Sequence, residues 1–122
     1  MGRKRNMEDC YNDFVVIGDR KVKIKYSVKK IIKFENFSYV LLKIPRVDLE
    51  YDELNNVFCY DAQGNLVWQI DNSMPPCVKS KEQIPYIDLE IIDGFLYATD
   101  FWERRFLVER TSGKLLGIKI VH

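Results

Sequence analysis

Apolar and polar positions alternate with a period of two over much of the chain. Residues 20–26 read RKVKIKY, in which charged and apolar side chains take turns, as in an antiparallel strand with one wet face. The run Phe14–Ile17 precedes this stretch across Gly18-Asp19, and glycine at the first central position of a two-residue loop suits a type II′ turn. The pattern predicts a first hairpin.

A nearly continuous apolar run, SYVLLKI at residues 38–44, ends at Pro45. Such a run predicts a central strand that is buried on both faces. Two further strands, 56–60 and 65–70, flank the turn DAQG at 61–64, where the glycine can take the positive φ that closes a short hairpin with a bulge.

Strand parity predicts which face of the 65–70 strand is buried. Trp68, Leu66 and Ile70 are separated by two residues each, so their side chains should point to the same side. We therefore expect Trp68 to be buried or half-buried on the core side, together with Leu66 and Ile70.

The second half of the chain repeats this plan. Residues 86–92 turn at Asp93-Gly94 into 95–99, and residues 106–110 turn at 111–113 into 114–121. Placing Gly64 over Gly113 aligns three further pairs, namely Leu66 with Leu115, Val67 with Leu116, and Phe58 with Leu107. Each half is predicted to end in the same hairpin, with positive φ at both glycines.

These elements predict an all-β fold in a single domain of residues 1–122. We expect residues 1–12 to be a flexible arm, 14–70 the first β half, 71–85 a polar, proline-containing connecting loop, and 86–121 the second β half. Two antiparallel sheets of four to five strands, each with an apolar face, bury those faces most simply on one another. The arrangement is a sandwich or a flattened barrel built from two β-meander halves.

Residues 56–121 carry a resemblance to known repeats. The stretch DGFLYATDFWERRFLVERTSGKLLG resembles one four-stranded blade of a quinoprotein-type β-propeller, and NVFCYDAQGNLVWQI resembles the outer hairpin of another. The pair also resembles small uncharacterised bacterial proteins with blade-like repeats. The resemblance implies architecture only, because two units are far short of a closed propeller. It implies no quinone cofactor.

Composition and charge narrow the class of protein. Hydrophobic residues make up 47% and charged residues 30% of the chain, which is too apolar for a disordered protein. Residues 1–46 contain twelve Lys and Arg against five Asp and Glu, whereas residues 47–122 contain seven against thirteen. Either the two oppositely charged halves pack together, or the basic first third is a binding surface for nucleic acid.

The cysteines and the N-terminus indicate a cytoplasmic protein. Cys10, Cys59 and Cys77 lack metal-type spacing, and an odd number suits a reducing compartment. Charges at 1–13 stand where a secretory signal would be apolar, and no apolar run is long enough to span a membrane.

The sequence contains no evident catalytic or metal-binding set. The single histidine, His122, is the last residue, so it supplies no fixed internal base. Cys59 fits a small buried hydrophobe, and Cys77 a loop thiol without a strong activating neighbour. The acidic residues 48–53 lack the glycine turn of a calcium loop, and Asp88 and Glu90 fit the wet side of a strand. We predict no enzyme, no cofactor and no metal.

The least ordinary stretch is DFWERR at residues 100–105, between two predicted strands. Large aromatic side chains beside arginines are typical of the residues that dominate binding energy in protein interfaces, and loop tips commonly present them. The alternative is that an aromatic ring folds back to cap the core. The predicted binding residues are Phe101, Trp102, Arg104 and Arg105.

Two functions from different classes follow. The first is a non-catalytic protein-interaction module, such as an immunity-type protein or a subunit of a complex, that uses the DFWERR loop to bind an unknown protein partner. The second is a nucleic-acid-binding protein in which lysines line phosphates while aromatic rings stack on bases. Its predicted face consists of Lys21, Lys23, Lys25, Lys29, Lys30 and Lys33.

Overall fold

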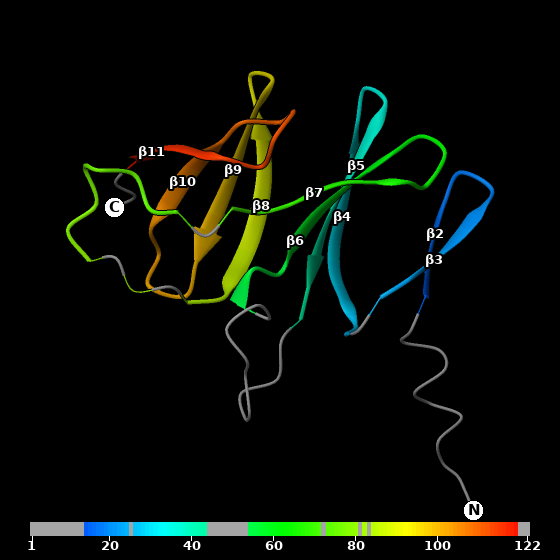
Figure 1. Cartoon of the computed structure of the whole chain (residues 1–122), viewed down its shortest axis with the longest axis horizontal. Helices are drawn as coiled ribbons and strands as arrows, with labels where there is room; N and C mark the ends of the chain where they lie inside the picture. Colours follow the sequence, from blue (N-terminus) through cyan, green and yellow to red (C-terminus); the bar gives the residue numbers. More distant parts are fainter. Residues whose placement is uncertain are drawn as a thin grey trace, which may run out of the picture.

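The computed structural model describes residues 14–24, 26–43, 54–71, 73–80, 82 and 84–119. These residues form ten strands and no α-helix (Figure 1). The strands are β2 (Phe14–Ile17), β3 (Arg20–Lys23), β4 (Val28–Phe34), β5 (Phe37–Leu42), β6 (Val57–Asp61), β7 (Leu66–Gln69), β8 (Tyr86–Ile92), β9 (Phe95–Asp100), β10 (Arg105–Val108) and β11 (Leu115–Lys119). No helix in the described part of the chain is long and apolar enough to cross a membrane.

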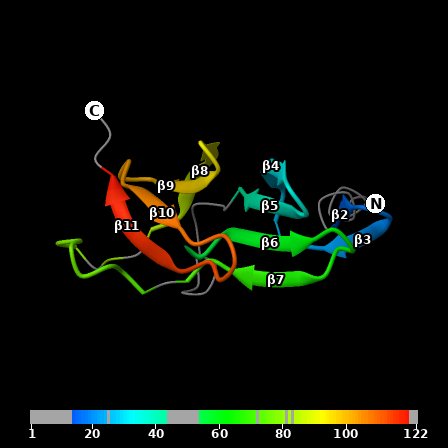
Figure 2. The same cartoon turned by 90° about the horizontal axis from the view of Figure 1, so that it is seen from above.

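The strands form two four-stranded antiparallel meanders and one separate hairpin. The first sheet has the order β4-β5-β6-β7, the second sheet has the order β8-β9-β10-β11, and β2 and β3 form the N-terminal hairpin. The two four-stranded sheets pack against each other and do not close into a barrel (Figure 2). The predicted all-β fold of two packed sheets is confirmed, and the flattened barrel is excluded.

The most apolar run of the sequence forms the centre of the first sheet. β5 lies between β4 and β6, and its residues 38–42 are all buried. Tyr39 and Leu41 face the second sheet, whereas Val40 and Leu42 face the N-terminal hairpin. The prediction of a central strand buried on both faces is confirmed.

β4 has no counterpart among the predicted strands. Its sequence, VKKIIKF, does not alternate strictly, and its register with β5 shifts between Val28 and Lys30. The turn that joins the two strands holds Glu35 at a φ of 58° and contains no glycine. Both usual signals of a hairpin, period and turn chemistry, are therefore missing from this part of the sequence.

The main core lies between the two four-stranded sheets. It includes Trp68 and Cys59 from the first sheet and Leu89, Leu96 and Phe106 from the second. Trp68 is only 6% exposed, as its strand parity predicted. The connecting segment between β7 and β8 also contributes to this core, through buried Val78 and half-buried Met74.

The prediction that Leu66 shares the buried face of Trp68 is wrong. Leu66 is 57% exposed and lies opposite Tyr60, whose side chain belongs to the other face of the sheet. A β-bulge shifts the register between Cys59 and Tyr60, so one extra residue, Val67, separates the two faces. Ile70, beyond the bulge, is buried as predicted.

Strand pairing also corrects the repeat. When the β6–β7 and β10–β11 hairpins are aligned at their bulges, Leu66 corresponds to Leu115 and Val67 to Leu116, as predicted. Phe58 corresponds to Phe106 and not to Leu107. The turn of the second sheet is one residue longer than that of the first, and this shifts the preceding strand. Gly64 and Gly113 have φ values of 85° and 77°, so the predicted positive φ is confirmed at both.

The N-terminal hairpin covers the other face of the first sheet. Val15, Ile17 and Ile24 pack on Val40, Leu42 and Tyr60 in a second, smaller core. Gly18 has a φ of 62° and Asp19 is not in the left-handed region, which agrees with the predicted type II′ turn. The described residues thus form three β layers: hairpin, first sheet and second sheet (Figure 2).

Candidate functional site

The candidate site is the turn of residues 100–105, called the aromatic turn below, which joins β9 to β10. Asp100 is 1% exposed, and its carboxylate accepts hydrogen bonds from the backbone amides of Trp102 and Arg104, both at 3.0 Å. Its second oxygen accepts one from Nε of Arg104 at 2.8 Å. Glu103 has a φ of 63° and donates its amide to the Asp100 carbonyl. One buried carboxylate therefore organises the whole turn.

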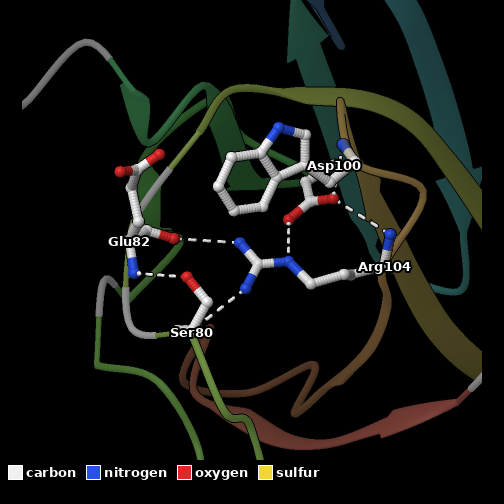
Figure 3. Close-up of polar contacts among 5 residues, drawn as sticks. Ser80, Glu82, Asp100 and Arg104 are labelled. Atoms are coloured by element: carbon white, nitrogen blue, oxygen red, sulfur yellow. Dashed lines mark hydrogen bonds and ion pairs between the residues drawn. The ribbon is translucent and has the colours of Figure 1, made fainter.

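Arg104 ties the aromatic turn to the connecting segment. Its terminal nitrogens donate to the carbonyl oxygens of Ser80 and Glu82, each at 2.9 Å (Figure 3). The Arg104 side chain is 13% exposed, so it is enclosed by these partners. Arg104 is thus an internal anchor that holds two segments together, and its planar guanidinium suits several acceptors at once.

Phe101 and Trp102 lie on the outside of this fixed turn. They are 60% and 49% exposed, and the Trp102 ring stacks on the Arg104 guanidinium at 5.0 Å. The Phe101 amide donates to the carbonyl of Pro85, which fixes the backbone beneath the exposed ring. Two large apolar rings are therefore held in water by a turn with little freedom to move.

Arg105 lies on a different face from the other predicted binding residues, Phe101, Trp102 and Arg104. Its guanidinium binds Glu90 at 3.0 Å and lies over the Tyr97 ring at 5.8 Å. Both partners belong to the face of the second sheet that points away from the first sheet. The structure brings Phe101, Trp102 and Arg104 together and places Arg105 outside the aromatic turn's surface.

The described lysines of the predicted nucleic-acid face are divided among several surfaces. Lys21 and Lys23 pair with exposed residues of β2 and border a groove of about 310 Å³ beside β7. Lys30 points the other way and binds Asp88 and the Leu89 carbonyl, at 3.0 and 2.7 Å. Lys33 borders a separate hollow of about 240 Å³, which also contains Glu35. Lys29 is exposed on β4.

The two described cysteines differ in environment. Cys59 is fully buried in the main core, and this burial, with a smaller contribution from the Asp61 carboxylate, raises the pKa of its thiol to about 12. Cys77 is exposed. Both thiols are free, and no three His, Cys, Asp or Glu side chains of the described residues gather as a metal site would require.

Several sequence predictions fall outside the described residues. These concern the arm at 1–12, Cys10, Lys25, the acidic residues 48–53 and His122.

Sequence reasoning found the exposed rings but missed what fixes them. The contacts of Arg104 with Ser80 and Glu82 use backbone carbonyls, which leave no signal in the sequence. Asp100 gave a weak signal, since an aspartate at the start of a turn often accepts amides from the residues that follow.

The geometry defines an all-β protein of layered antiparallel sheets that presents a rigid aromatic turn at one end of its second sheet. The chain belongs to the family described as Domain of unknown function (DUF7957), which it matches over residues 6–120. Neither the curated proteins nor the solved structures contain a match to it.

Proposed function

We propose that this protein is a non-catalytic protein-interaction module, an immunity-type protein or a subunit of a complex, that binds its partner through the aromatic turn. The observation that carries the proposal is the exposure of Phe101 and Trp102 on a turn fixed by Asp100 and Arg104. Exposed aromatic rings dominate the binding energy of many protein interfaces. A turn that is already ordered loses little conformational entropy when it binds.

The partner surface that fits this turn is an apolar pocket wide enough for one or two rings. Arg104 does not contact the partner in this proposal, because its guanidinium is occupied by Asp100, Ser80 and Glu82. It acts as a positioning residue that also supports the Trp102 ring from below. The free thiols of Cys59 and Cys77 agree with a cytoplasmic location, which forms part of the proposal.

The nucleic-acid alternative receives less support from the geometry. Binding a nucleic-acid strand requires a continuous row of basic side chains along its phosphate backbone. Lys30 is paired with Asp88, and Lys21 and Lys23 border a different groove from the hollow beside Lys33. The Lys30–Asp88 pair instead joins the basic first half of the chain to the acidic second half.

The test is an affinity capture from nuclease-treated native lysate with wild-type, Trp102→Ala and Val16→Ala baits. Val16 is a matched control, since it is 64% exposed on the N-terminal hairpin. We expect a specific protein that the Trp102→Ala bait binds at least about 30-fold more weakly, equivalent to about 2 kcal/mol, and that the control retains.

Thermal melts of the same baits separate binding from folding. Trp102→Ala should melt close to wild type, because half of the ring is already in water. A strongly lowered melting temperature would show instead that the ring caps the core. Equal capture by all three baits, or capture that disappears with nuclease, would contradict the proposal.

A further inference from the structure

The corrected repeat reveals which surfaces of the two sheets correspond. Cys59 pairs with Trp68, and Leu107 pairs with Gly117, each as the first pair beyond the bulge of its hairpin. Cys59 therefore corresponds to Leu107, and Trp68 corresponds to Gly117. The tight turns at 35–36 and 93–94 likewise equate Tyr39 with Tyr97. In the first sheet, Tyr39, Cys59 and Trp68 all belong to one face, which packs on the second sheet.

No other strand of the described residues covers the corresponding face of the second sheet. Called the outer face below, it contains Phe95, Tyr97, Leu107 and Gly117, and it points away from the first sheet. Phe95 is 55% exposed, whereas Tyr97, Leu107 and Gly117 are half-buried, and none of the four belongs to either core. Figure 2 shows no other strand on this side of β8–β11.

The three layers stack in one direction. The N-terminal hairpin packs on one face of the first sheet, and the opposite face of the first sheet packs on the second sheet. At the first of these contacts Arg20 packs on Gly64, and at the second Trp68 packs on the equivalent Gly113. Each layer therefore uses the same kind of contact to reach the next one, and the outer face is where the next layer would lie.

The outer face has open space above Gly117, called the hollow below, at the position that Trp68 occupies in the first sheet. Trp68 fills the space above β7, but its counterpart Gly117 has no side chain. A Cβ at Gly117 would meet no heavy atom within 4 Å beyond its chain neighbours. An apolar side chain from another molecule would fit above this glycine, beside Leu107.

Charge indicates what kind of molecule fits. Arg105 is already bound to Glu90, whereas Lys119 lies over the Tyr97 ring at 5.9 Å and forms no ion pair within the described part of the chain. The other open end of the stack, the outside of the N-terminal hairpin, contains Lys21 and Lys23 beside exposed Phe14 and Val16. A second copy stacked head to tail would bring these lysines towards Lys119, which like-charge repulsion opposes.

We infer that the outer face is a second interaction surface, which binds a different protein that presents an apolar sheet-like face with an acidic rim. The partner's large apolar side chain enters the hollow at Gly117, and a carboxylate pairs with Lys119. This surface is separate from the aromatic turn, and the inference stands whether or not the aromatic turn binds anything.

The test uses the full chain as bait in nuclease-treated native lysate, with wild-type, Gly117→Glu, Lys119→Glu and Val16→Glu variants. Gly117 is not in the left-handed region and has open space above it, so Gly117→Glu should fold and melt like wild type. It fills the hollow and repels an acidic rim. Lys119→Glu reverses the charge and leaves the hollow empty, and Val16→Glu places the same carboxylate on the opposite end of the stack.

We expect a captured protein that Gly117→Glu and Lys119→Glu each bind at least about tenfold more weakly and that Val16→Glu retains. The inference is overturned if no captured protein distinguishes Gly117→Glu from Val16→Glu. It is also overturned if sedimentation shows self-association that both variants abolish, since the occupant would then be a second copy. Trp102→Ala, run in parallel, reports on the aromatic turn alone and keeps the two proposals apart.

Discussion

Trp68 packs directly on the backbone of Gly113, across the space between the two sheets. A Cβ at Gly113 would lie 2.5 Å from Cε3 of the Trp68 ring, and Nε1 of Trp68 donates a hydrogen bond to the Arg110 carbonyl at 2.7 Å. The first sheet therefore packs on the turn between β10 and β11 of the second sheet. This contact fixes how the two halves of the chain meet.

Gly113→Ala should consequently destabilise the fold more than Gly64→Ala. Both glycines have positive φ, which costs a residue with a side chain about 1–2 kcal/mol. At Gly113 the new methyl group also collides with a buried ring, for about 1–3 kcal/mol more. At Gly64 it would lie 3.0 Å from Cβ and Cδ of Arg20, a tight contact but a milder one than the 2.5 Å approach at Gly113. Urea unfolding of the two variants measures the difference, and equal losses would contradict this packing.

Arg104→Ala should cost about 3–5 kcal/mol of unfolding free energy, because it leaves the Asp100 carboxylate buried without its cation. The variant should also release the segment around Ser80 and Glu82, which would show as faster amide hydrogen exchange there. Lys30→Ala is the control: it breaks an ion pair whose two side chains are 42% and 45% exposed, and should cost less than about 1 kcal/mol. Similar losses in both variants would refute the anchoring role of Arg104.

Thiol labelling should separate Cys77 from Cys59. Cys77 is exposed and should react with a thiol reagent in the native protein. Cys59 is buried, and its pKa is raised to about 12, so it should react only as fast as the protein unfolds. Mass spectrometry of the labelled peptides after a time course at about pH 8, near the ordinary thiol pKa, gives both rates. Comparable native rates would mean that the main core opens far more readily than its packing implies.

Asp61 should make stability depend on acid pH. Hydrogen bonds from the backbone amide of Asn65, and with smaller effects from the Asn65 side chain and the Gln63 amide, lower the pKa of its carboxyl group. A carboxyl group whose pKa is lower in the folded state contributes stability above about pH 4, its unfolded pKa, and that contribution is lost as pH falls through the folded pKa.

Asp61→Asn removes this titration. The melting temperature of the variant should therefore decline less steeply than that of wild type between about pH 4 and pH 2. Melts across this range, compared with melts at about pH 7 as the reference, measure the difference. Parallel curves would show that the turn does not depend on the charge of Asp61.

Most of the hairpins could be predicted from the residues in their turns. Gly18, Gly64 and the Asp93-Gly94 pair each marked a real hairpin, because positive φ is easily adopted only by glycine and a few polar residues. The apolar run at 38–42 marked the central strand for an equally local reason. Where the turn was unconventional, as at Glu35, the hairpin and its first strand went unseen.

The two aromatic residues of the aromatic turn could be predicted from the sequence, but the orientations of its arginines could not. Phe101 and Trp102 were identified from residue type and from their place between two strands. The opposite orientations of Arg104 and Arg105 were not predicted, because both were placed in the loop, whereas Arg105 is the first residue of β10 and Arg104 is the last residue before it.

By itself the sequence determined the hairpins, their turns and the all-β class, because these depend on residues that are neighbours in the chain. Only the structure decided the position of the bulge that turns Leu66 away from Trp68, the anchoring of Arg104 and the exposure of Phe95 on the outer face. The anchoring of Arg104 and the packing that leaves the outer face uncovered depend on segments that lie far apart in the sequence, and the bulge depends on how two strands pair. A bulge in particular reverses the facing of every residue before it, and the apolar pattern of β7 alone does not show that pairing with β6 leaves Val67 as the extra residue.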